Sequence, residues 1–420
     1  MRFLILNHNV RDRGTYHRAF PFARHFAARG HDVVFCCVHP QRLYRATRAR
    51  VDVGGGRTLI HYEMPSWSGA QDRQEGRGPI DIARRAWLAL TGRFDVVWAF
   101  SHKLDCVIPA RIARRASGAT FVSDWCDRWG GQDGLFDICA KEERFLRLPT
   151  RVQAARRRAF AQEAILEESV RRNEADGVTV ISRALYERAR NLGLPEERLL
   201  QTYSGADLDR ITPQDKASCR RELGLPADAL LLGYLANFNP DETLLLDALE
   251  GIMARVSPAR FVYSGVPLHA PESDLKRRGL DGRIHYLGWA PFEQCVRMLG
   301  ACDVLLLPLS ARRLNVERFP HKLTDYLAAG RPIAACDAGD VGRFIKMNDA
   351  GELAPPTAEG LAGAVVRLLQ RRAEWDAIGR RARQTAEEHF NWNRIGDAVL
   401  GFISRVGGLG PRRTGGTRIQ

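Results

Sequence analysis

The sequence lacks any apolar run of the ~18 residues that an α-helix needs to cross a bilayer. Its first apolar run, Phe3 to Leu6, stops at Asn7, short of the ~7 to 15 residues of a signal-peptide core. With 45% hydrophobic residues, the chain still has enough apolar side chains to fold around a core. We therefore expect a folded protein in the cytoplasm.

Cysteine pairs at metal-binding or redox spacing are also missing. The nine cysteines are an odd number, and none of them forms a Cys-x-x-Cys pair. Most lie inside apolar runs, such as Cys36 and Cys302, which is typical of reduced, packed thiols. Cys126 and Cys139 are the two that could pair or react. We expect no metal and no bound cofactor, since no Asp-x-Asp or histidine cluster occurs in the loops described below.

Lysine is scarce in a chain that is otherwise strongly basic. Only six of the 63 basic residues are lysine, so arginine carries nearly all of the positive charge behind the net value of +14. Many arginines stand beside alanine, as on solvated helix faces, and no zinc-finger, helix-turn-helix or aromatic-interleaved motif accompanies them. We expect no nucleic-acid partner. Two segments that mix arginine with apolar residues, 83–93 and 145–160, leave open a peripheral contact with an acidic membrane.

Short apolar runs alternate with segments of helical spacing, which predicts an α/β fold with parallel sheets covered on both faces. A length of 420 residues fits two such domains. We expect one domain over 1–205, a second over 206–385, a helix over 386–406 that returns to the first domain, and a disordered tail over 407–420. The glycine-rich segment 52–80 is expected to be a long loop. Strands are expected at 3–6, 32–38, 95–100, 120–123, 178–182, 229–234, 260–265, 283–288, 302–308 and 332–336, and helices at 15–28, 104–116, 243–255, 291–300 and 321–329.

Ligands of open parallel sheets bind outside the carboxyl ends of the strands, so the loops that follow strands are informative. In the first domain, Gly14 would let backbone N–H groups approach an anion, unless it is a simple turn glycine. His102 follows a strand and can contact an acceptor or be a hydrogen-bonded structural residue. The loop with Asp124, Trp125 and Asp127 suits a sugar, because carboxylates accept hydrogen bonds from hydroxyls and indole rings stack on sugar rings. Capping aspartates in a structural loop are the alternative. No Gly-x-Gly-x-x-Gly motif is present, which argues against a dinucleotide enzyme.

One loop and the helix after it carry the strongest signal in the second domain. Pro320 fits the first helical position and Gly330 the stop, so we expect Glu317 in the loop and Asp325 about one turn inside the helix. The helix N-terminus, with Lys322 beside it, suits a diphosphate. The carboxylates can bind hydroxyls on either side of it, sugar at Glu317 and ribose at Asp325. An N-capped, solvated amphipathic helix is the alternative.

At these residues the sequence resembles the retaining glycosyltransferases of family 4, which have the GT-B fold of two facing Rossmann-like domains. The family's Glu-x7-Glu pair is matched by Glu317 and Asp325, with a conservative change at the second position. The string from Phe319 to Pro332 is a common form of the same motif. The stretch 284–289 resembles the family's base-binding segment, and 390–392 resembles the start of its return helix. The likeness covers nearly the whole chain, and its motifs are specific in the carboxyl-terminal half.

The resemblance implies a donor site in the second domain, an acceptor site in the first, and transfer in the cleft. It implies an enzyme that moves a sugar from a nucleotide-sugar to a glycan, lipid-linked or small-molecule acceptor, with retention of the anomeric configuration. The catalytic residues would be Glu317, His102 and Lys322; the donor-binding residues Gly14, Tyr263, Gly265, Leu287, Gly288, Trp289, Arg318, Phe319, Pro320 and Asp325; and the acceptor-side residues Asp124, Trp125 and Asp127.

One departure from the family pattern concerns the diphosphate. The family usually has Gly-Arg-x-x-x-x-Lys after the first strand of the donor domain, and here Asn237 and Glu242 stand where the Arg and Lys are expected. Other cations neutralise the phosphates, or the donor differs, or catalysis is lost. The usual Gly-Gly pair of the first domain is also reduced to Gly14. Two alternatives therefore stay open: a nucleotide-sugar epimerase or hydrolase, which turns over donor without acceptor, and a degenerate GT-B subunit that only binds.

Overall fold

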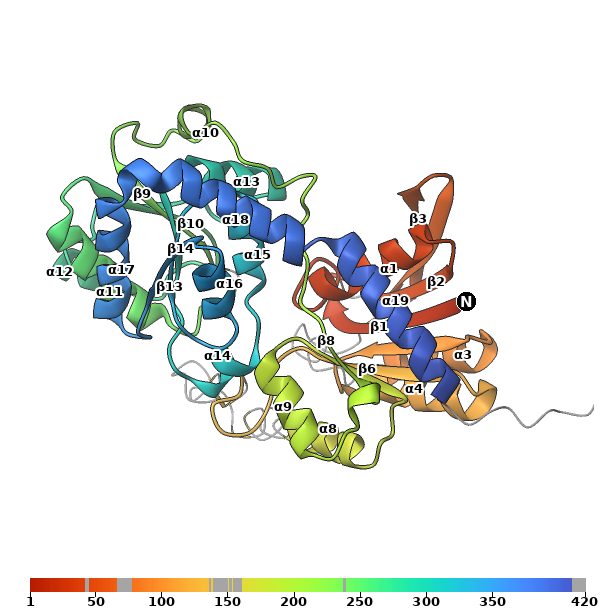
Figure 1. Cartoon of the computed structure of the whole chain (residues 1–420). Coiled ribbons are helices and arrows are strands. Elements are labelled where there is room, and N and C mark those ends of the chain that lie inside the picture. The colour runs from red at the N-terminus through yellow and green to blue at the C-terminus, as the bar shows by residue number, and fades with distance from the viewer. Residues whose placement is uncertain are drawn as a thin grey trace, which may run out of the picture. The chain divides into compact units, whose positions relative to one another are not determined.

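The computed structural model in Figure 1 describes residues 1–41, 45–65, 78–135, 137–138, 150, 153, 161–236 and 239–409. The chain divides into two compact units, which we call the first unit (Met1–Tyr203 with Trp392–Gln420) and the second unit (Ser204–Asn391). Each unit is built on one sheet of mainly parallel strands flanked by helices. The predicted α/β class with two parallel sheets is therefore confirmed.

The first unit has strand order β3-β4-β2-β1-β5-β6-β7-β8. β1 is longer than expected, because the polar residues after Leu6 still pair: Asn7 lies opposite Phe100, and Val10 lies opposite Val38. The strands are β1 (Arg2–Val10), β2 (Asp32–Val38), β3 (Thr47–Gly54), β4 (Arg57–Met64), β5 (Val96–Phe100), β6 (Thr120–Trp125), β7 (Gly177–Val180) and β8 (Leu199–Gln201), and the helices are α1 (Tyr16–Ala28), α3 (Pro79–Thr91), α4 (Leu104–Ser117), α8 (Ala161–Arg171), α9 (Arg183–Asn191) and α19 (Trp392–Leu409).

The expectation of a loop over 52–80 is wrong for its first part. β3 pairs antiparallel with β4 through a turn at Gly54, Gly55 and Gly56, all of which have positive φ. β3 is an edge strand, largely exposed, and it carries Arg48 and Arg50. It therefore lacks the apolar run by which a buried strand is recognised. Residues 66–77 lie outside the described part of the chain.

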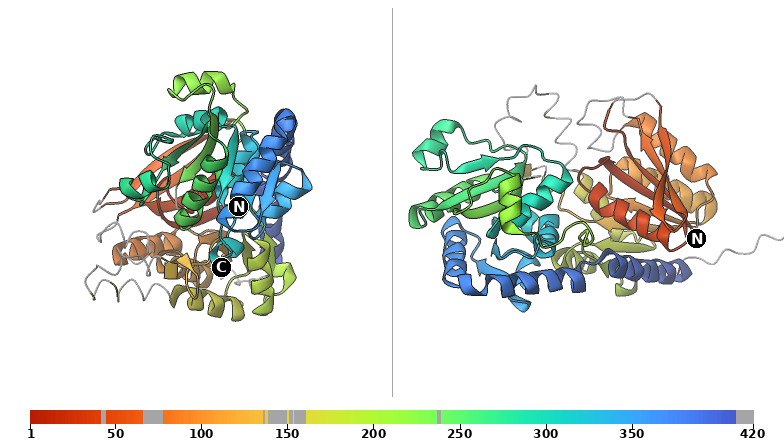
Figure 2. Two further views of the ribbon diagram at one scale, coloured as in Figure 1. Left: turned by 90° about the vertical axis from the view of Figure 1, so that its left-hand side faces the viewer. Right: turned by 90° about the horizontal axis from the view of Figure 1, so that it is seen from above.

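The last helix, α19, belongs to the first unit. Phe402 of α19 packs in the same apolar core as Phe26 and Trp98, and Trp392 meets Phe22 edge-on with 5.1 Å between ring centroids. Figure 2 shows this helix in dark blue. A single return helix was expected over 386–406, but α18 ends at His389 and α19 begins at Trp392. The tail was expected from residue 407, yet α19 continues to Leu409, and the residues after it lie outside the described part.

The second unit has strand order β11-β10-β9-β12-β13-β14, and every pairing described in it is parallel. Its central strands β9 and β12 are fully buried, which explains why their continuous apolar runs were visible in the sequence. The strands are β9 (Leu230–Ala236), β10 (Ala259–Gly265), β11 (Ile284–Tyr286), β12 (Val304–Leu307), β13 (Ile333–Cys336) and β14 (Gly351–Ala354), and the helices are α10 (Lys216–Glu222), α11 (Glu242–Arg255), α12 (Glu272–Arg277), α13 (Phe292–Ala301), α14 (Arg313–Glu317), α15 (His321–Ala328), α16 (Val341–Met347), α17 (Ala358–Gln370) and α18 (Trp375–His389).

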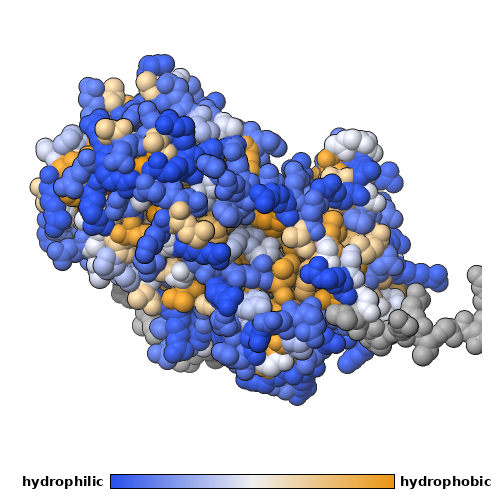
Figure 3. All heavy atoms as spheres, viewed as in Figure 1, coloured by the Kyte–Doolittle hydropathy of each residue, from blue (hydrophilic) through white to orange (hydrophobic). Residues whose placement is uncertain are grey.

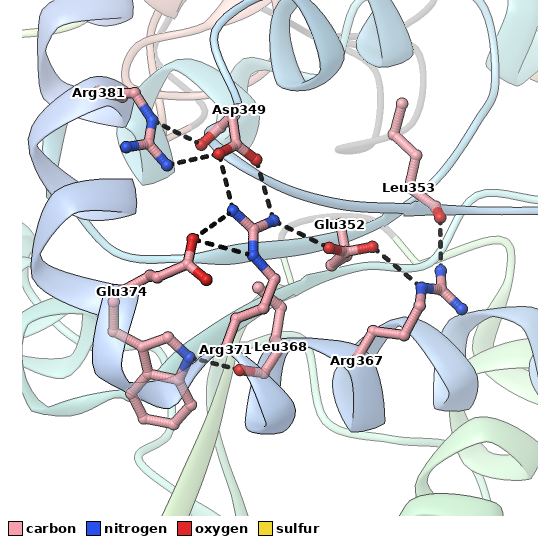
Figure 4. A network of polar contacts seen from close by, with 9 residues as sticks. Asp349, Glu352, Leu353, Arg367, Leu368, Arg371, Glu374 and Arg381 are labelled. Atoms are coloured by element: carbon pink, nitrogen blue, oxygen red, sulfur yellow. Dashed lines mark hydrogen bonds and ion pairs between the residues drawn. The ribbon is translucent and has the colours of Figure 1, made fainter.

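Arginine side chains form a network of ion pairs near the surface of the second unit. Arg371 pairs with Asp349 at 2.7 Å, with Glu352 at 3.0 Å and with Glu374 at 2.9 Å, and Arg381 joins the same Asp349 (Figure 4). These hydrogen bonds to carboxylates raise the pKa of Arg371, and those from Arg371 and Arg381 lower the pKa of Asp349. Hydrophilic residues cover most of the face drawn in Figure 3. None of the described helices combines the length and apolar composition that a membrane span requires.

Candidate functional site

The carboxyl edge of the second sheet brings together the loops that follow its parallel strands. After β12 the chain forms α14 and then α15. Glu317 is the last residue of α14 rather than a loop residue as expected, because the N–H of Arg318 still donates to the Leu314 carbonyl at 3.1 Å. Pro320, which has no N–H to donate, stands directly before α15 as its N-cap. The break between the two helices leaves Glu317 partly buried just ahead of the α15 N-terminus.

Lys322 lies in the first turn of α15, whose N-cap residue provides no side-chain hydrogen bond. Its Nζ is 2.9 Å from the Tyr234 hydroxyl oxygen and 4.0 Å from the centroid of that ring. Among the described residues, no carboxylate lies within ion-pair distance of this ammonium. Burial, followed by the charge of Arg318, lowers the pKa of Lys322 well below its usual value. A bound anion would favour the charged form and would also interact with the helix dipole.

The other residues of the motif divide into packing and polar positions. Phe319 is buried and stacks on Phe390 with 5.5 Å between centroids, and it meets Phe344 edge-on at 5.8 Å. Phe319 thus fixes the chain entering α15 and presents little surface to a ligand. Asp325 is partly buried one turn into the helix, 3.8 Å from Nε2 of His321. Its carboxylate is therefore on the same helix as Lys322, as the sequence indicated.

The predicted base-binding stretch lies at the ends of β10 and β11. The Tyr263 and Tyr286 rings stack at 4.6 Å, and the Tyr286 hydroxyl donates to the Gly265 carbonyl at 2.7 Å. Gly265 has φ +120, and a Cβ there would lie 2.6 Å from the Ala236 carbonyl oxygen, so only glycine fits. Its N–H donates to the carbonyl of Gly288 at 2.9 Å, which joins the two strand ends. Leu287 beside it is partly buried, and Trp289 is 63% exposed.

Glu242, which replaces the family's lysine, has a structural role in this chain. Its carboxylate accepts hydrogen bonds from the backbone N–H of His269 at 2.6 Å and of Ala270 at 3.0 Å, and it pairs with Nδ1 of His269 at 2.8 Å. Glu242 therefore holds the loop after β10 in place. Asn237 lies outside the described residues. Nearby, Asp241 accepts a hydrogen bond from Nδ2 of Asn315 at 2.8 Å, which links the loops after β9 and β12.

In the first unit, Gly14 and His102 lie in loops after β1 and β5. Gly14 is exposed with φ +55, and a Cβ there would be 2.7 Å from Oδ1 of Asn9, which requires glycine at this turn. His102 is buried, with Nδ1 3.3 Å from Oγ of Ser123. Burial lowers the pKa of His102 to about 3, so the ring is neutral at pH 7.

Asp124 and Trp125 were expected in a loop but are the last two residues of β6, and they are more deeply buried than the composition of this stretch indicated. Asp124 is fully buried, paired with Arg18 at 3.0 Å, and it accepts a hydrogen bond from Oγ1 of Thr179 at 2.6 Å. Trp125 is also fully buried, and the Arg188 guanidinium lies 5.1 Å from its ring. Asp127 is partly buried. Asp124 and Trp125 therefore stabilise the sheet edge, and neither presents a face to solvent.

Two residues at these edges were missed from the sequence. Tyr234 lies in β9 and contacts Lys322, but a tyrosine inside an apolar strand run gives no sign of this neighbour. His8 lies in β1 and was assigned to a loop, because the polar residues from Asn7 on suggested that the strand had ended. His8 lies inside β1, which runs to Val10, but directly after Asn7, the last residue of β1 that pairs with β5, and the sequence does not reveal this pairing.

Two family models match the chain: Glycosyl transferase 4-like domain over residues 14–205, and Glycosyl transferases group 1 over residues 229–371. The chain belongs to the group 1 glycosyltransferases. The predicted resemblance to this glycosyltransferase family is thereby confirmed, and the two matches fall in the first and second units respectively.

Curated relatives of this group 1 glycosyltransferase match it over part of its length. A D-inositol 3-phosphate glycosyltransferase of Saccharomonospora viridis is 29% identical over 210 residues, which is 47% of each chain. The amylovoran biosynthesis glycosyltransferase AmsK of Erwinia amylovora is 31% identical over 137 residues, or 31% of this chain and 34% of that protein. The chain thus spans about half the length, or less, of these relatives.

Solved structures show the same fold over nearly the whole chain. Sucrose-phosphate synthase from Thermosynechococcus elongatus superposes with a TM-score of 0.73 at 18% identity, covering 97% of this chain and 100% of that one. Anabaena HepE in complex with UDP-glucose superposes with a TM-score of 0.64 at 16% identity, covering 96% and 99%. The group 1 glycosyltransferase therefore has the predicted GT-B fold of two Rossmann-like domains.

Proposed function

We propose that this protein transfers a sugar from a nucleotide-sugar to an acceptor hydroxyl, with retention of the anomeric configuration and without a metal. The observation that supports the proposal most is the α15 N-terminus, where Lys322 has no carboxylate partner among the described residues. Glu317 stands just ahead of this helix end and Asp325 one turn inside it. A diphosphate at Lys322 would thus have one carboxylate on each side of it for sugar and ribose hydroxyls.

Catalysis at such a site would rest on positioning and electrostatic stabilisation. The bond between the anomeric carbon and the diphosphate oxygen breaks, the acceptor hydroxyl oxygen bonds to that carbon from the same face, and its proton passes to the leaving diphosphate oxygen. The leaving diphosphate gains negative charge, which the Lys322 ammonium and the N–H groups of the first turn of α15 stabilise. Glu317 would hold sugar hydroxyls, and Asp325 would hold the ribose.

The role of Glu242 bears on the alternatives of altered donor and lost catalysis. Glu242 holds two backbone N–H groups of the loop after β10, so the family's lysine has been replaced by a loop anchor. With that cation absent, Lys322 and Arg318 are the cations nearest to the α15 N-terminus in sequence. A diphosphate that loses its hydration needs such compensation. We therefore propose that these two residues carry the phosphate binding.

A binding screen tests the proposal directly. Nucleoside diphosphates of all common bases, and their sugars, would be titrated calorimetrically, and the best donor then incubated with and without candidate acceptors. The D-inositol 3-phosphate named for the curated relatives is the first acceptor to try. Transfer that keeps the donor's anomeric configuration, observed by proton NMR, supports the proposal. Donor turnover without an acceptor favours an epimerase or hydrolase, and binding without any turnover favours a degenerate subunit.

We also propose that α3 rests on an anionic membrane surface. This helix buries charged side chains and exposes apolar ones, which is the reverse of the usual pattern. Asp81 and Arg85 are 4% and 0% exposed, whereas Trp87 and Leu90 are 68% and 50% exposed. The exposed Arg93 follows the helix, and the net charge of +14 complements anionic headgroups. An acceptor that is itself a lipid would then lie at the surface that the first unit contacts. The second segment singled out from the sequence, 145–160, is outside the described residues apart from 150 and 153.

A further inference from the structure

His8 lies where an open parallel sheet most often binds a ligand. In the first unit the chain leaves β1 toward β2 on one side, and β5 and β6 follow on the other side of β1. The strand order therefore reverses between β1 and β5, and ligands bind outside the carboxyl ends of strands at such a reversal. His8 follows Asn7, which pairs with Phe100 at the end of β5, so His8 stands at this point.

The hydrogen bond of one ring nitrogen fixes the chemistry of the other. Nδ1 of His8 lies 3.2 Å from the carbonyl oxygen of Phe100. A carbonyl oxygen only accepts, so Nδ1 carries the hydrogen, and in the neutral ring Nε2 then presents a lone pair. Burial, followed by the charge of Lys103, lowers the pKa of His8 well below its ordinary value, which keeps the ring neutral at pH 7. Nε2 of His8 is thus a hydrogen-bond acceptor.

This acceptor has no partner within the described structure. Nε2 of His8 is buried without a hydrogen bond, and so is Nε2 of His102. Leaving a buried polar atom unpaired is destabilising, so two of them on neighbouring strand ends call for a ligand that pairs with them. Nδ1 of His102 contacts the Ser123 hydroxyl, which can donate or accept, so the Nε2 of His102 can present a hydrogen.

The surroundings of His8 come from two loops at the same edge. Trp129, in the loop after β6, meets the His8 ring edge-on at 5.5 Å and is only partly buried. The Lys103 ammonium lies 4.6 Å from the centroid of the same indole. Ser101, just before His102, has φ +89, an uncommon conformation for a residue other than glycine. Trp129 and Lys103 thus lie beside His8 at this edge.

We propose that Nε2 of His8 accepts a hydrogen bond from a hydroxyl of the sugar acceptor, beside His102. The inference rests on the proposed transferase function and assigns a residue of the acceptor site that the family motif does not mark. An acceptor hydroxyl both donates and accepts, which matches the lone pair on His8 and the hydrogen that His102 can present. The acceptor is thereby of the polyol or sugar class.

Two substitutions of His8 separate ligand binding from structure. His8→Asn keeps an N–H at the place of Nδ1, and so the bond to Phe100, but has no group at the place of Nε2. His8→Gln keeps an oxygen at the place of Nε2 and loses the bond to Phe100. The probes are the p-nitrophenyl glycosides of glucose, galactose and mannose, tested for binding by saturation-transfer NMR and for transfer with the best donor. Donor affinity, read calorimetrically, should be the same in both variants, because the residues proposed to hold the diphosphate, Lys322 and Arg318, lie in the second unit.

We expect one variant to lose glycoside binding and the other to lose stability. His8→Asn should melt like wild type and weaken glycoside binding about tenfold or more, the loss of roughly one hydrogen bond. His8→Gln should melt at a lower temperature and keep binding within about threefold. Glycoside binding in His8→Asn equal to wild type would overturn the inference, as would no binding of any of the three glycosides by wild type at millimolar concentration. Failure of the wild type to bind any nucleotide-sugar would instead overturn the proposed function.

Discussion

The carboxyl edges of the two sheets differ in whether their charged side chains have a partner of opposite charge. At the first edge, two charged pairs are buried: Asp124 with Arg18, and Arg85 with Asp81. The histidines there are neutral. At the second edge, Lys322 sits partly buried at a helix N-terminus with only a tyrosine hydroxyl as its described polar partner. Matched charge stabilises a scaffold, whereas a cation without a carboxylate leaves its charge for a ligand. The first edge thus suits a hydroxylated substrate and the second a phosphate.

The largest effect is expected when a matched charge of the first edge is removed. Asp124→Ala leaves the Arg18 guanidinium buried without its carboxylate, which should lower the free energy of unfolding by about 3–5 kcal/mol. The control is Glu187→Ala, because the Arg183–Glu187 pair is 60% and 50% exposed and should contribute less than about 1 kcal/mol. Denaturant unfolding measures both. If Asp124→Ala were as stable as wild type but unable to use an acceptor, Asp124 would be an acceptor-binding residue, as the sequence predicted, and not a structural one.

A carboxylate at the second edge should behave differently, affecting rate rather than stability. Glu317→Gln is expected to lower kcat by roughly 100-fold or more, since a group that holds the reacting sugar acts in the transition state. The melting temperature should change little, because Glu317 is only partly buried, at the end of the short helix α14. Glu359→Gln, an exposed position in the same unit, is the control. Unchanged turnover in Glu317→Gln would remove this residue from the site.

The neutral histidines of the first edge should make stability depend on pH. Burial lowers the pKa of His102 to about 3 in the folded state, below the ordinary value near 6.5 that applies when the chain is unfolded. Stability is then fully present above about pH 6.5 and falls as the pH drops, by about 1.4 kcal/mol per pH unit, or about 2 kcal/mol at pH 5. His102→Gln should flatten this dependence, and the exposed His17→Gln should not. Equal slopes in wild type and His102→Gln would show that His102 is accessible to protons.

The cation of the second edge can be tested through binding alone. Lys322→Ala should weaken nucleoside diphosphate binding by at least about tenfold, or ~1.4 kcal/mol, and Arg318→Ala should weaken it less. The plain nucleoside should bind equally to all variants, because only the phosphate contact is lost. Lys346→Ala, an exposed lysine of the same unit, is the control in calorimetric titrations. Equal diphosphate affinity in Lys322→Ala and wild type would refute the anion site and favour the degenerate-subunit alternative.

The same two edges show what the sequence could reveal. Buried parallel strands such as β9 and β12 are continuous apolar runs, and the positions of Pro320 and Gly330 frame α15, so the second edge could be predicted closely. The first edge depends on contacts between distant residues. Arg18 and Asp124 are 106 positions apart, and nothing local marks them as a buried pair. For the same reason, the burial of Trp125 and the continuation of β1 through His8 could not be predicted.

The smallest effect concerns the outer face of α3 in the first unit. Trp87 and Leu90 are exposed although the opposite face of this helix buries Asp81 and Arg85, so the apolar side chains are not needed for the core. If they rest on a membrane, Trp87→Ser should reduce the fraction of protein that sediments with phosphatidylglycerol vesicles by about threefold, which corresponds to ~0.7 kcal/mol.

Trp289→Ser is the matched control, because Trp289 is similarly exposed, at 63%, but lies in the second unit. Binding to uncharged phosphatidylcholine vesicles should be weak for every variant, and raised salt should weaken binding to the acidic ones. Equal sedimentation of Trp87→Ser and wild type, or no sedimentation of wild type at low salt, would exclude α3 as a membrane contact and point to an acceptor free in solution.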